Sequence, residues 1–122
     1  MSSGRAGART RDALVAVEVA LAVLLLIGAG DDGLWPSLAM ARAVMERRRR
    51  LGGSKGDVLL EYAEAGHLIG KAYVPGGTTL IGGGRIETGG SVAANAAAQA
   101  DAWPRVLAFL RAAMSPGPRT RE

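Results

Sequence analysis

The sequence predicts an α/β fold in which two parallel strands have flanking helices and a long glycine-rich loop. Two short apolar runs, at residues 21–28 and 57–62, each end in a turn, and an amphipathic segment at residues 36–51 separates them. A short apolar run bounded by glycines is typical of a strand buried on both faces, and a helix between two such strands indicates a parallel crossover. We therefore expect both strands to end at the same edge of one sheet.

The composition narrows the classes of function. The chain has 122 residues, which is enough for one domain or part of one. It contains no cysteine and a single histidine, so disulfides and thiolate metal sites are excluded, and we expect neither a metal nor a cofactor. The net charge is +4, but the few aromatic residues are not interleaved with the basic ones, and we expect no nucleic-acid partner.

The N-terminal part of the chain has two interpretations. Residues 1–11 and 115–122 are predicted to be disordered tails, and residues 12–114 to form the folded segment. In the alternative, the apolar run at residues 13–30 is a transmembrane helix that anchors a small protein in a membrane, because about 17–25 residues suffice to span a bilayer. Glu18 lies within this run and argues against the membrane helix, since an acidic side chain at membrane depth is costly.

The segment between the two strands is predicted to be a helix over residues 36–51. Its last turns hold Arg47–Arg50, and we interpret this run as a solvated helix end, where positive charge is favourable beside the free carbonyl groups. The following Gly52–Gly56 matches the pattern Gly-x-Ser-x-Gly. A nucleophile elbow must follow a strand and begin a helix, whereas Ser54 follows a helix and precedes a strand, so we interpret this segment as a loop.

The remaining segments are a loop and a helix. Residues 70–90 form a glycine-rich loop, which carries neither the phosphate-loop pattern nor the dinucleotide fingerprint. Residues 91–114 are alanine-rich and then amphipathic, which predicts a helix beginning at Ser91. Pro104 is expected to kink this segment or to begin a second helix.

Acid–base candidates follow each of the two strands. Asp31 and Asp32 come after the first strand, and His67 comes after the second. If both turns meet at one edge of the sheet, a carboxylate there can orient an imidazole, as in the Asp–His half of a nucleophilic triad. Aspartates in a glycine turn and a histidine in a loop also have purely structural explanations, and the spacing alone does not choose between Asp31 and Asp32.

Four segments occur in an order that carries more information than any one of them. They are Ile27-Gly-Ala-Gly-Asp-Asp-Gly-Leu-Trp-Pro-Ser37, Tyr62-x-x-Ala-Gly-His-Leu-Ile69, Tyr73-x-Pro75 and Ala98-Gln-Ala-Asp-Ala-Trp-Pro104. In this order the sequence resembles the C-terminal part of the bile-acid-CoA:amino-acid N-acyltransferase and acyl-CoA thioesterase family. The resemblance implies a C-terminal fragment of an α/β-hydrolase fold. It also implies that Asp32 orients His67, and that His67 is the general base for a Ser or Cys nucleophile acting on an acyl-CoA thioester.

The family's nucleophile precedes the acid, and no segment before Asp32 has the strand–nucleophile–helix pattern. We therefore expect this chain to supply Asp32 and His67 to a Ser/Cys-His-Asp triad and to be inactive alone, with acyl-CoA as the substrate once the missing N-terminal part completes it. The acceptor, water or an amino acid, stays open. The expected location is cytoplasmic, without a membrane partner. A further hypothesis is a non-catalytic fragment that self-associates through exposed strand edges.

Overall fold

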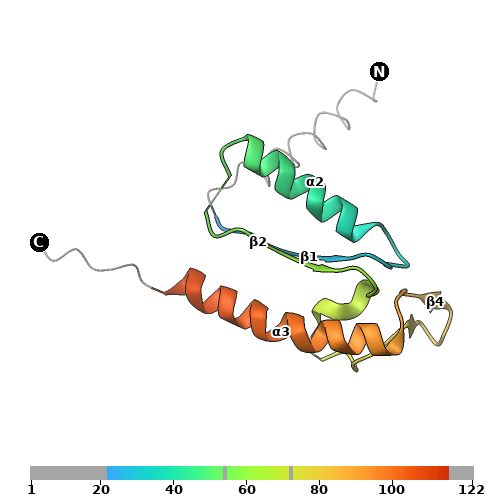
Figure 1. Ribbon diagram of the computed structural model, residues 1–122. Helices are drawn as coiled ribbons and strands as arrows, with labels where there is room; N and C mark the ends of the chain where they lie inside the picture. Colours follow the sequence, from blue (N-terminus) through green and yellow to red (C-terminus); the bar gives the residue numbers. More distant parts are fainter. Residues whose placement is uncertain (1–21, 54, 72, 116–122) are drawn as a thin grey trace, which may run out of the picture.

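The computed structural model describes residues 22–53, 55–71 and 73–115 (Figure 1). The predicted tail at residues 1–11 and all but Ser115 of the predicted tail at residues 115–122 lie outside the described residues, as does Ser54. In chain order the elements are β1 (Leu25–Ala29), α2 (Ser37–Arg50), β2 (Val58–Tyr62), the short 3-10 helix η1 (His67–Gly70), β3 (Leu80–Ile81), β4 (Ile86–Glu87) and α3 (Val92–Met114).

The predicted parallel strand pair is confirmed. β1 and β2 pair in parallel, in a register that runs from Leu25 opposite Val58 to Ala29 opposite Tyr62. Helix α2 covers one face of this pair, and α3 lies with η1 on the other face, which gives three layers (Figure 1). The molecule is therefore a small α/β structure, and both strands end on the same side, where the turns after β1 and β2 meet.

The core that supports this edge is small and consists mainly of alanine. Ala29, Ala65, Ile69 and Ala98 are buried together, and Ile27 and Tyr62 pack against them. Small side chains let the layers approach closely. At Gly28, for example, an added Cβ atom would lie 2.8 Å from the Cα atom of Leu38 in α2. The close approach of α2 to β1 places the turn after β1 directly beside the start of the helix.

The structure refines two predictions about helices and loops. α3 runs as one helix from Val92 to Met114 with Pro104 inside it, so no second helix begins at the proline. The glycine-rich loop at residues 70–90 contains the short antiparallel pair β3–β4, in which Leu80 lies opposite Glu87. This pair turns the chain back toward the edge of the main sheet, where Asp32 forms an isolated bridge with Gly89.

The interpretation of Arg47–Arg50 as a solvated helix end is wrong for one member of the run. The Arg48 side chain is 1% exposed and forms an ion pair with Asp57, just before β2. Its guanidinium also donates a hydrogen bond to the Ala22 carbonyl, and Asp57 Oδ1 accepts one from the Leu24 N–H at 2.9 Å. Arg48 and Asp57 thus tie the end of α2 to the beginning of both strands.

The membrane alternative concerned residues 13–30. Residues 25–29 of that run form β1, and residues 13–21 lie outside the described part of the chain. Over the residues that the structure describes, no helix combines the length and the apolar character that crossing a bilayer requires.

Candidate active site

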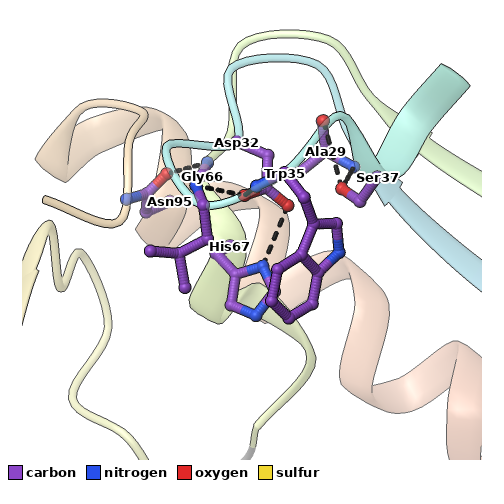
Figure 2. A network of polar contacts seen from close by, with 8 residues as sticks. Ala29, Asp32, Trp35, Ser37, Gly66, His67 and Asn95 are labelled. Atoms are coloured by element: carbon purple, nitrogen blue, oxygen red, sulfur yellow. Dashed lines mark hydrogen bonds and ion pairs between the residues drawn. The ribbon is translucent and has the colours of Figure 1, made fainter. Parts of the chain in front are cut away.

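Asp32 and His67 come together where β1 and β2 end (Figure 2). The turn after β1 carries Asp32, and His67 begins η1, five residues after the end of β2. Asp32 Oδ2 lies 2.9 Å from His67 Nδ1, with side-chain exposures of 1% for Asp32 and 20% for His67. The two residues are 35 positions apart in sequence, and the parallel crossover brings them together.

The second carboxylate oxygen of Asp32 is held by its own turn. Asp32 Oδ1 accepts hydrogen bonds from the backbone N–H groups of Leu34 at 2.8 Å and Trp35 at 3.1 Å. Burial alone would raise the pKa of Asp32, but hydrogen bonds from His67, Ser37 and these two N–H groups outweigh it and lower the pKa below its ordinary value. The carboxylate is therefore ionised at neutral pH, and its oxygens can only accept hydrogen bonds.

An ionised Asp32 determines which imidazole nitrogen of His67 carries the proton. Because the carboxylate has no proton to give, Nδ1 must donate to Asp32 Oδ2. The neutral ring then keeps the lone pair on Nε2, at the other side of the imidazole, where it can accept a proton from a reacting group. This arrangement of charge and tautomer is the one that a general base requires.

A small hollow of about 230 Å³ adjoins the imidazole. Its walls include Ile27 and Ala29 from β1, Trp35, and Ile69 from η1. The Trp35 indole lies edge-to-face against His67, with 4.2 Å between the ring centroids and an interplanar angle of 77° (Figure 2). This ring contact limits the orientations of the imidazole.

Asp31 has a different task from Asp32. Its backbone carbonyl and its Oδ2 atom both lie 3.1 Å from the N–H of Gly90, which donates to them. Asp31 therefore joins the turn after β1 to the segment before α3, while the imidazole contact belongs to Asp32. The spacing in the sequence did not distinguish the two aspartates, whereas their contacts in the structure do.

Three residues of the site carried no predicted role. Trp35 and Ser37 belong to the motif after β1, but the sequence reasoning gave neither a function. Asn95 is 3% exposed in the first turn of α3, and its side chain accepts a hydrogen bond from the N–H of Gly66, next to His67 (Figure 2). In the sequence, Asn95 could have been recognised only as a polar amide residue among the alanines at the start of this helix.

The serines near the pair are occupied by structural contacts. The Ser37 hydroxyl accepts from the Ala29 N–H at 3.0 Å, and its single proton is shared between the Ala29 carbonyl, at 3.3 Å, and the Asp32 carboxylate. Ser91 accepts from the Ala94 N–H at 3.1 Å and caps α3, and Ser54 of the Gly-x-Ser-x-Gly match lies outside the described residues. In the described ranges, no cluster of three or more acidic or histidine side chains offers a place for a metal ion.

Comparison with known proteins identifies the family. The family model described as BAAT / acyl-CoA thioester hydrolase C terminal matches residues 3–116. Acyl-coenzyme A thioesterase 2, mitochondrial, of Rattus norvegicus is 31% identical over 108 residues, which are 86% of this chain and 24% of the relative. Acyl-coenzyme A amino acid N-acyltransferase 1 of Mus musculus is 36% identical over 101 residues, 80% of this chain and 24% of the relative.

A third relative, acyl-coenzyme A thioesterase 1 of Rattus norvegicus, is 35% identical over 89 residues, 70% of this chain and 21% of the relative. The chain thus spans about a quarter of the length of the curated relatives it matches. The resemblance inferred from the motifs is confirmed, and the chain belongs to the BAAT / acyl-CoA thioester hydrolase C-terminal family.

Proposed function

We propose that this chain supplies the acid and the base of a Ser/Cys-His-Asp triad that acts on acyl-CoA thioesters within an α/β-hydrolase fold. The observation that carries the proposal is the 2.9 Å contact between the buried Asp32 carboxylate and His67 Nδ1 at the common end of two parallel strands. The names of the relatives, acyl-CoA thioesterases and an acyl-CoA amino acid N-acyltransferase, support acyl-CoA as the substrate.

Each residue has a defined part in the proposed reaction. His67 Nε2 takes the proton of a Ser or Cys nucleophile as the nucleophile attacks the thioester carbonyl, and gives it to the CoA thiolate that leaves as the acyl-enzyme forms. It then takes the proton of the acyl acceptor as the acceptor attacks the acyl-enzyme, and returns it to the nucleophile as the acyl product is released. Asp32 keeps the proton of the neutral imidazole on Nδ1 and stabilises the imidazolium once Nε2 is protonated. Trp35 holds the ring in the orientation that this exchange needs. The acceptor is water in a thioesterase and an amino acid in a transferase.

The nucleophile is the part of the triad that we assign to another segment. The sequence has no cysteine, and the Ser37 hydroxyl is engaged with the Ala29 backbone. The chain by itself therefore hydrolyses acyl-CoA no faster than the background reaction, because a base without a nucleophile and an oxyanion hole loses most of the rate enhancement. The cytoplasmic location stays a prediction from the sequence.

A chimeric enzyme tests the proposal directly. The aligned quarter of the rat thioesterase 2 is replaced by this chain, and acyl-CoA hydrolysis is followed as release of the free thiol. We expect a folded, active chimera that loses activity by about 10³-fold or more in His67→Ala and in Asp32→Asn. The matched control is Asp31→Asn, which leaves the imidazole contact in place and should keep the activity.

Two results would overturn the proposal. One is a folded chimera whose hydrolysis is unchanged by His67→Ala. The other is turnover at enzyme-like rates by the 122-residue chain alone, if that turnover survives Ser54→Ala. Gel filtration and a cooperative thermal transition establish that each chimera is folded before its activity is compared.

A further inference from the structure

We propose that Asn95 is a positioning residue, whose buried side-chain amide holds the turn that carries His67 in register with the turn that carries Asp32. The inference rests on the proposed function only in its consequence for catalysis, because the juxtaposition of the two turns is itself a structural property. Asn95 lies in the first turn of α3, on the opposite side of these loops from the imidazole (Figure 2).

The amide of Asn95 joins three segments that are distant in sequence. Its Oδ1 atom accepts from the N–H of Gly66 at 2.7 Å. Its Nδ2 atom donates to the carbonyls of Thr78 at 2.9 Å and Gly89 at 3.0 Å. Both N–H bonds and one lone pair of the amide are therefore in use. No apolar side chain of this size can satisfy the three backbone groups.

Two of these contacts act on the pair itself. Gly66 immediately precedes His67, so the bond to its N–H determines where η1 begins. Gly89 is the bridge partner of Asp32, so the bond to its carbonyl determines the position of the segment that lies against the turn after β1. Asn95 therefore connects both members of the Asp32–His67 pair to one rigid point, the N-terminal turn of a long helix.

The glycines around Asn95 provide a second, independent observation. Gly90 has φ of +71°, and a Cβ atom there would lie 2.0 Å from Asn95 Oδ1. A Cβ atom on Gly66 would lie 2.2 Å from the Gly89 carbonyl oxygen. The space that the amide needs exists only because these positions have no side chain. The residue before Gly89 also joins the two turns. The Thr88 carbonyl accepts hydrogen bonds from the N–H groups of His67 at 2.8 Å and Gly33 at 3.0 Å.

Gln99, one turn further along α3, offers a matched control. Its Nε2 atom donates to the carbonyls of Lys71 at 2.6 Å and Val74 at 2.7 Å. Gln99→Ala thus removes two amide-to-loop hydrogen bonds from the same helix without touching Gly66 or Gly89. A general weakening of the contacts between α3 and the loops should appear in both variants, whereas loss of positioning should appear only at Asn95.

The test is the imidazole tautomer of His67, read by two-bond proton–nitrogen NMR correlations in the full chain. His67 is the only histidine, so its signals need no assignment against others. We expect Nδ1-protonated imidazole in the wild type and in Gln99→Ala. In Asn95→Ala we expect the Nδ1-protonated fraction of the neutral ring to fall by about twofold or more, because an imidazole released from its carboxylate favours a proton on Nε2.

The pKa of Asp32 supplies a second readout in the same samples. Carbon-detected titration of the carboxyl group should show this lowered pKa returning toward its ordinary value in Asn95→Ala, as the His67 contact loosens. Gln99→Ala should leave it low. Neither measurement involves acyl-CoA. A chimera without activity would therefore contradict the proposed function and leave the role of Asn95 intact, whereas unchanged NMR readouts in Asn95→Ala would contradict the role of Asn95 and leave the proposed function intact.

Asn95→Asp keeps the proposal testable if Asn95→Ala does not fold. The carboxylate retains the acceptor for the Gly66 N–H but has no donor for Thr78 and Gly89, so the Nδ1-protonated fraction should lie below that of the wild type. A folded Asn95→Ala or Asn95→Asp variant with reduced stability but a wild-type tautomer and a wild-type Asp32 titration would overturn the proposal, because this is the result of a purely structural role.

Discussion

The two ends of the β1–β2 pair each carry a carboxylate with a nitrogen base, and the two pairs differ in what surrounds the base. At the beginning of the strands, Asp57 binds Arg48, whose side chain is 1% exposed. At the end of the strands, Asp32 binds His67, whose side chain is 20% exposed and adjoins a hollow. We call the Arg48–Asp57 end of the strands the closed end, because the guanidinium there is buried. We call the Asp32–His67 end the open end, because the Nε2 atom of the imidazole remains available.

The difference follows from the chemistry of the two bases. A guanidinium is always charged and has only donors, so Arg48 can be buried only if acceptors such as Asp57 and the Ala22 carbonyl surround it. An imidazole can lose its charge and has two distinct nitrogens, so His67 can bind Asp32 with one and keep the other free. An aspartate side chain therefore binds a permanently charged, buried base at one end of the strands and an imidazole with an available nitrogen at the other.

The largest expected effect comes from removing the ion pair between Arg48 and Asp57 at the closed end of the strands. Arg48→Met should lower the free energy of unfolding by about 3–5 kcal/mol, because it leaves the partly buried Asp57 carboxylate without its counter-charge. Urea-induced unfolding measures this change. Arg48→Met with Asp57→Asn should recover part of the loss, since no uncompensated charge remains and the asparagine oxygen still accepts from the Leu24 N–H.

Arg49→Met is the control for this prediction. Arg49 pairs with Glu46 on the exposed face of α2, with 76% of its side chain exposed. Its removal should change the unfolding free energy by less than about 0.5 kcal/mol. Equal effects at the two arginines would mean that the burial of Arg48 does not stabilise the fold.

The next effect comes from Asp32→Asn at the open end. The asparagine oxygen can still accept from the N–H groups of Leu34 and Trp35, but its amide then faces His67 Nδ1 as a donor. We expect the proton of the neutral imidazole to move to Nε2, which proton–nitrogen NMR detects, with a loss of about 1–3 kcal/mol in unfolding free energy. Asp31→Asn should leave the tautomer unchanged, and a shift of the same size there would contradict the separate tasks of the two aspartates.

The pH dependence compares the two carboxylates in one experiment. Burial opposes the ionisation of Asp57 as it does that of Asp32, but hydrogen bonds, from Arg48 and the Leu24 N–H at Asp57, lower the pKa in both cases. A lowered pKa in the folded state stabilises the protein above the ordinary value of 3.8, and this contribution is lost as the pH falls from there through the folded-state pKa.

Urea unfolding between about pH 6 and about pH 2 should therefore show stability falling with pH, and less steeply in Asp32→Asn and in Asp57→Asn than in the wild type. Each single variant should remove its own part of the pH dependence of the unfolding free energy, and the double variant should remove the most. An unchanged slope in both single variants would show that other carboxylates dominate the acid response.

Apart from the Arg49 control, the smallest effect is expected for Tyr62→Phe, at the same edge as the candidate site but away from the imidazole. Burial, together with the hydrogen bond to Asp101 at 2.7 Å, raises the pKa of Tyr62 to about 12. The substitution should lower the unfolding free energy by less than about 1 kcal/mol at neutral pH. A raised pKa stabilises the fold below the ordinary value of 10.0, and this share is lost between there and about 12.

Thermal unfolding in alkaline buffer checks the prediction for Tyr62. The wild type should lose more stability than Tyr62→Phe as the pH rises through that range, because the variant has no phenol to ionise. Parallel curves for the two proteins would exclude the Tyr62–Asp101 contact as a source of alkaline sensitivity.

Local patterns in the sequence were sufficient to predict both strands, the helix between them and the meeting of the Asp31–Asp32 turn with His67. Each of these follows from periodicity and from the geometry of a parallel crossover, whereas the choice of Asp32 over Asp31 came from the family resemblance. The burial of Arg48 could not be predicted, because its three neighbouring arginines have the same local pattern. What distinguishes Arg48 is contact with Asp57 and Ala22, which only the folded arrangement brings near.

The supporting part of the site was unpredictable for the same reason. Asn95 reads in the sequence as one polar residue in an alanine-rich helix, and its three hydrogen bonds reach loops that are 6 to 29 residues away along the chain. Pro104 predicted a kink or a new helix, but α3 continues through it. Propensity describes a segment in isolation, whereas α3 in the folded chain also packs against η1.

The contact of Asp31 with Gly90 has a consequence for the order of folding. It joins residues 59 apart in sequence, whereas β1, α2 and β2 are consecutive and pack on one another. Closing the longer loop early is entropically costly, so the strand–helix–strand unit is expected to form first and the candidate site last. Substitutions at Gly90 or Asn95 should then accelerate unfolding while leaving the refolding rate almost unchanged.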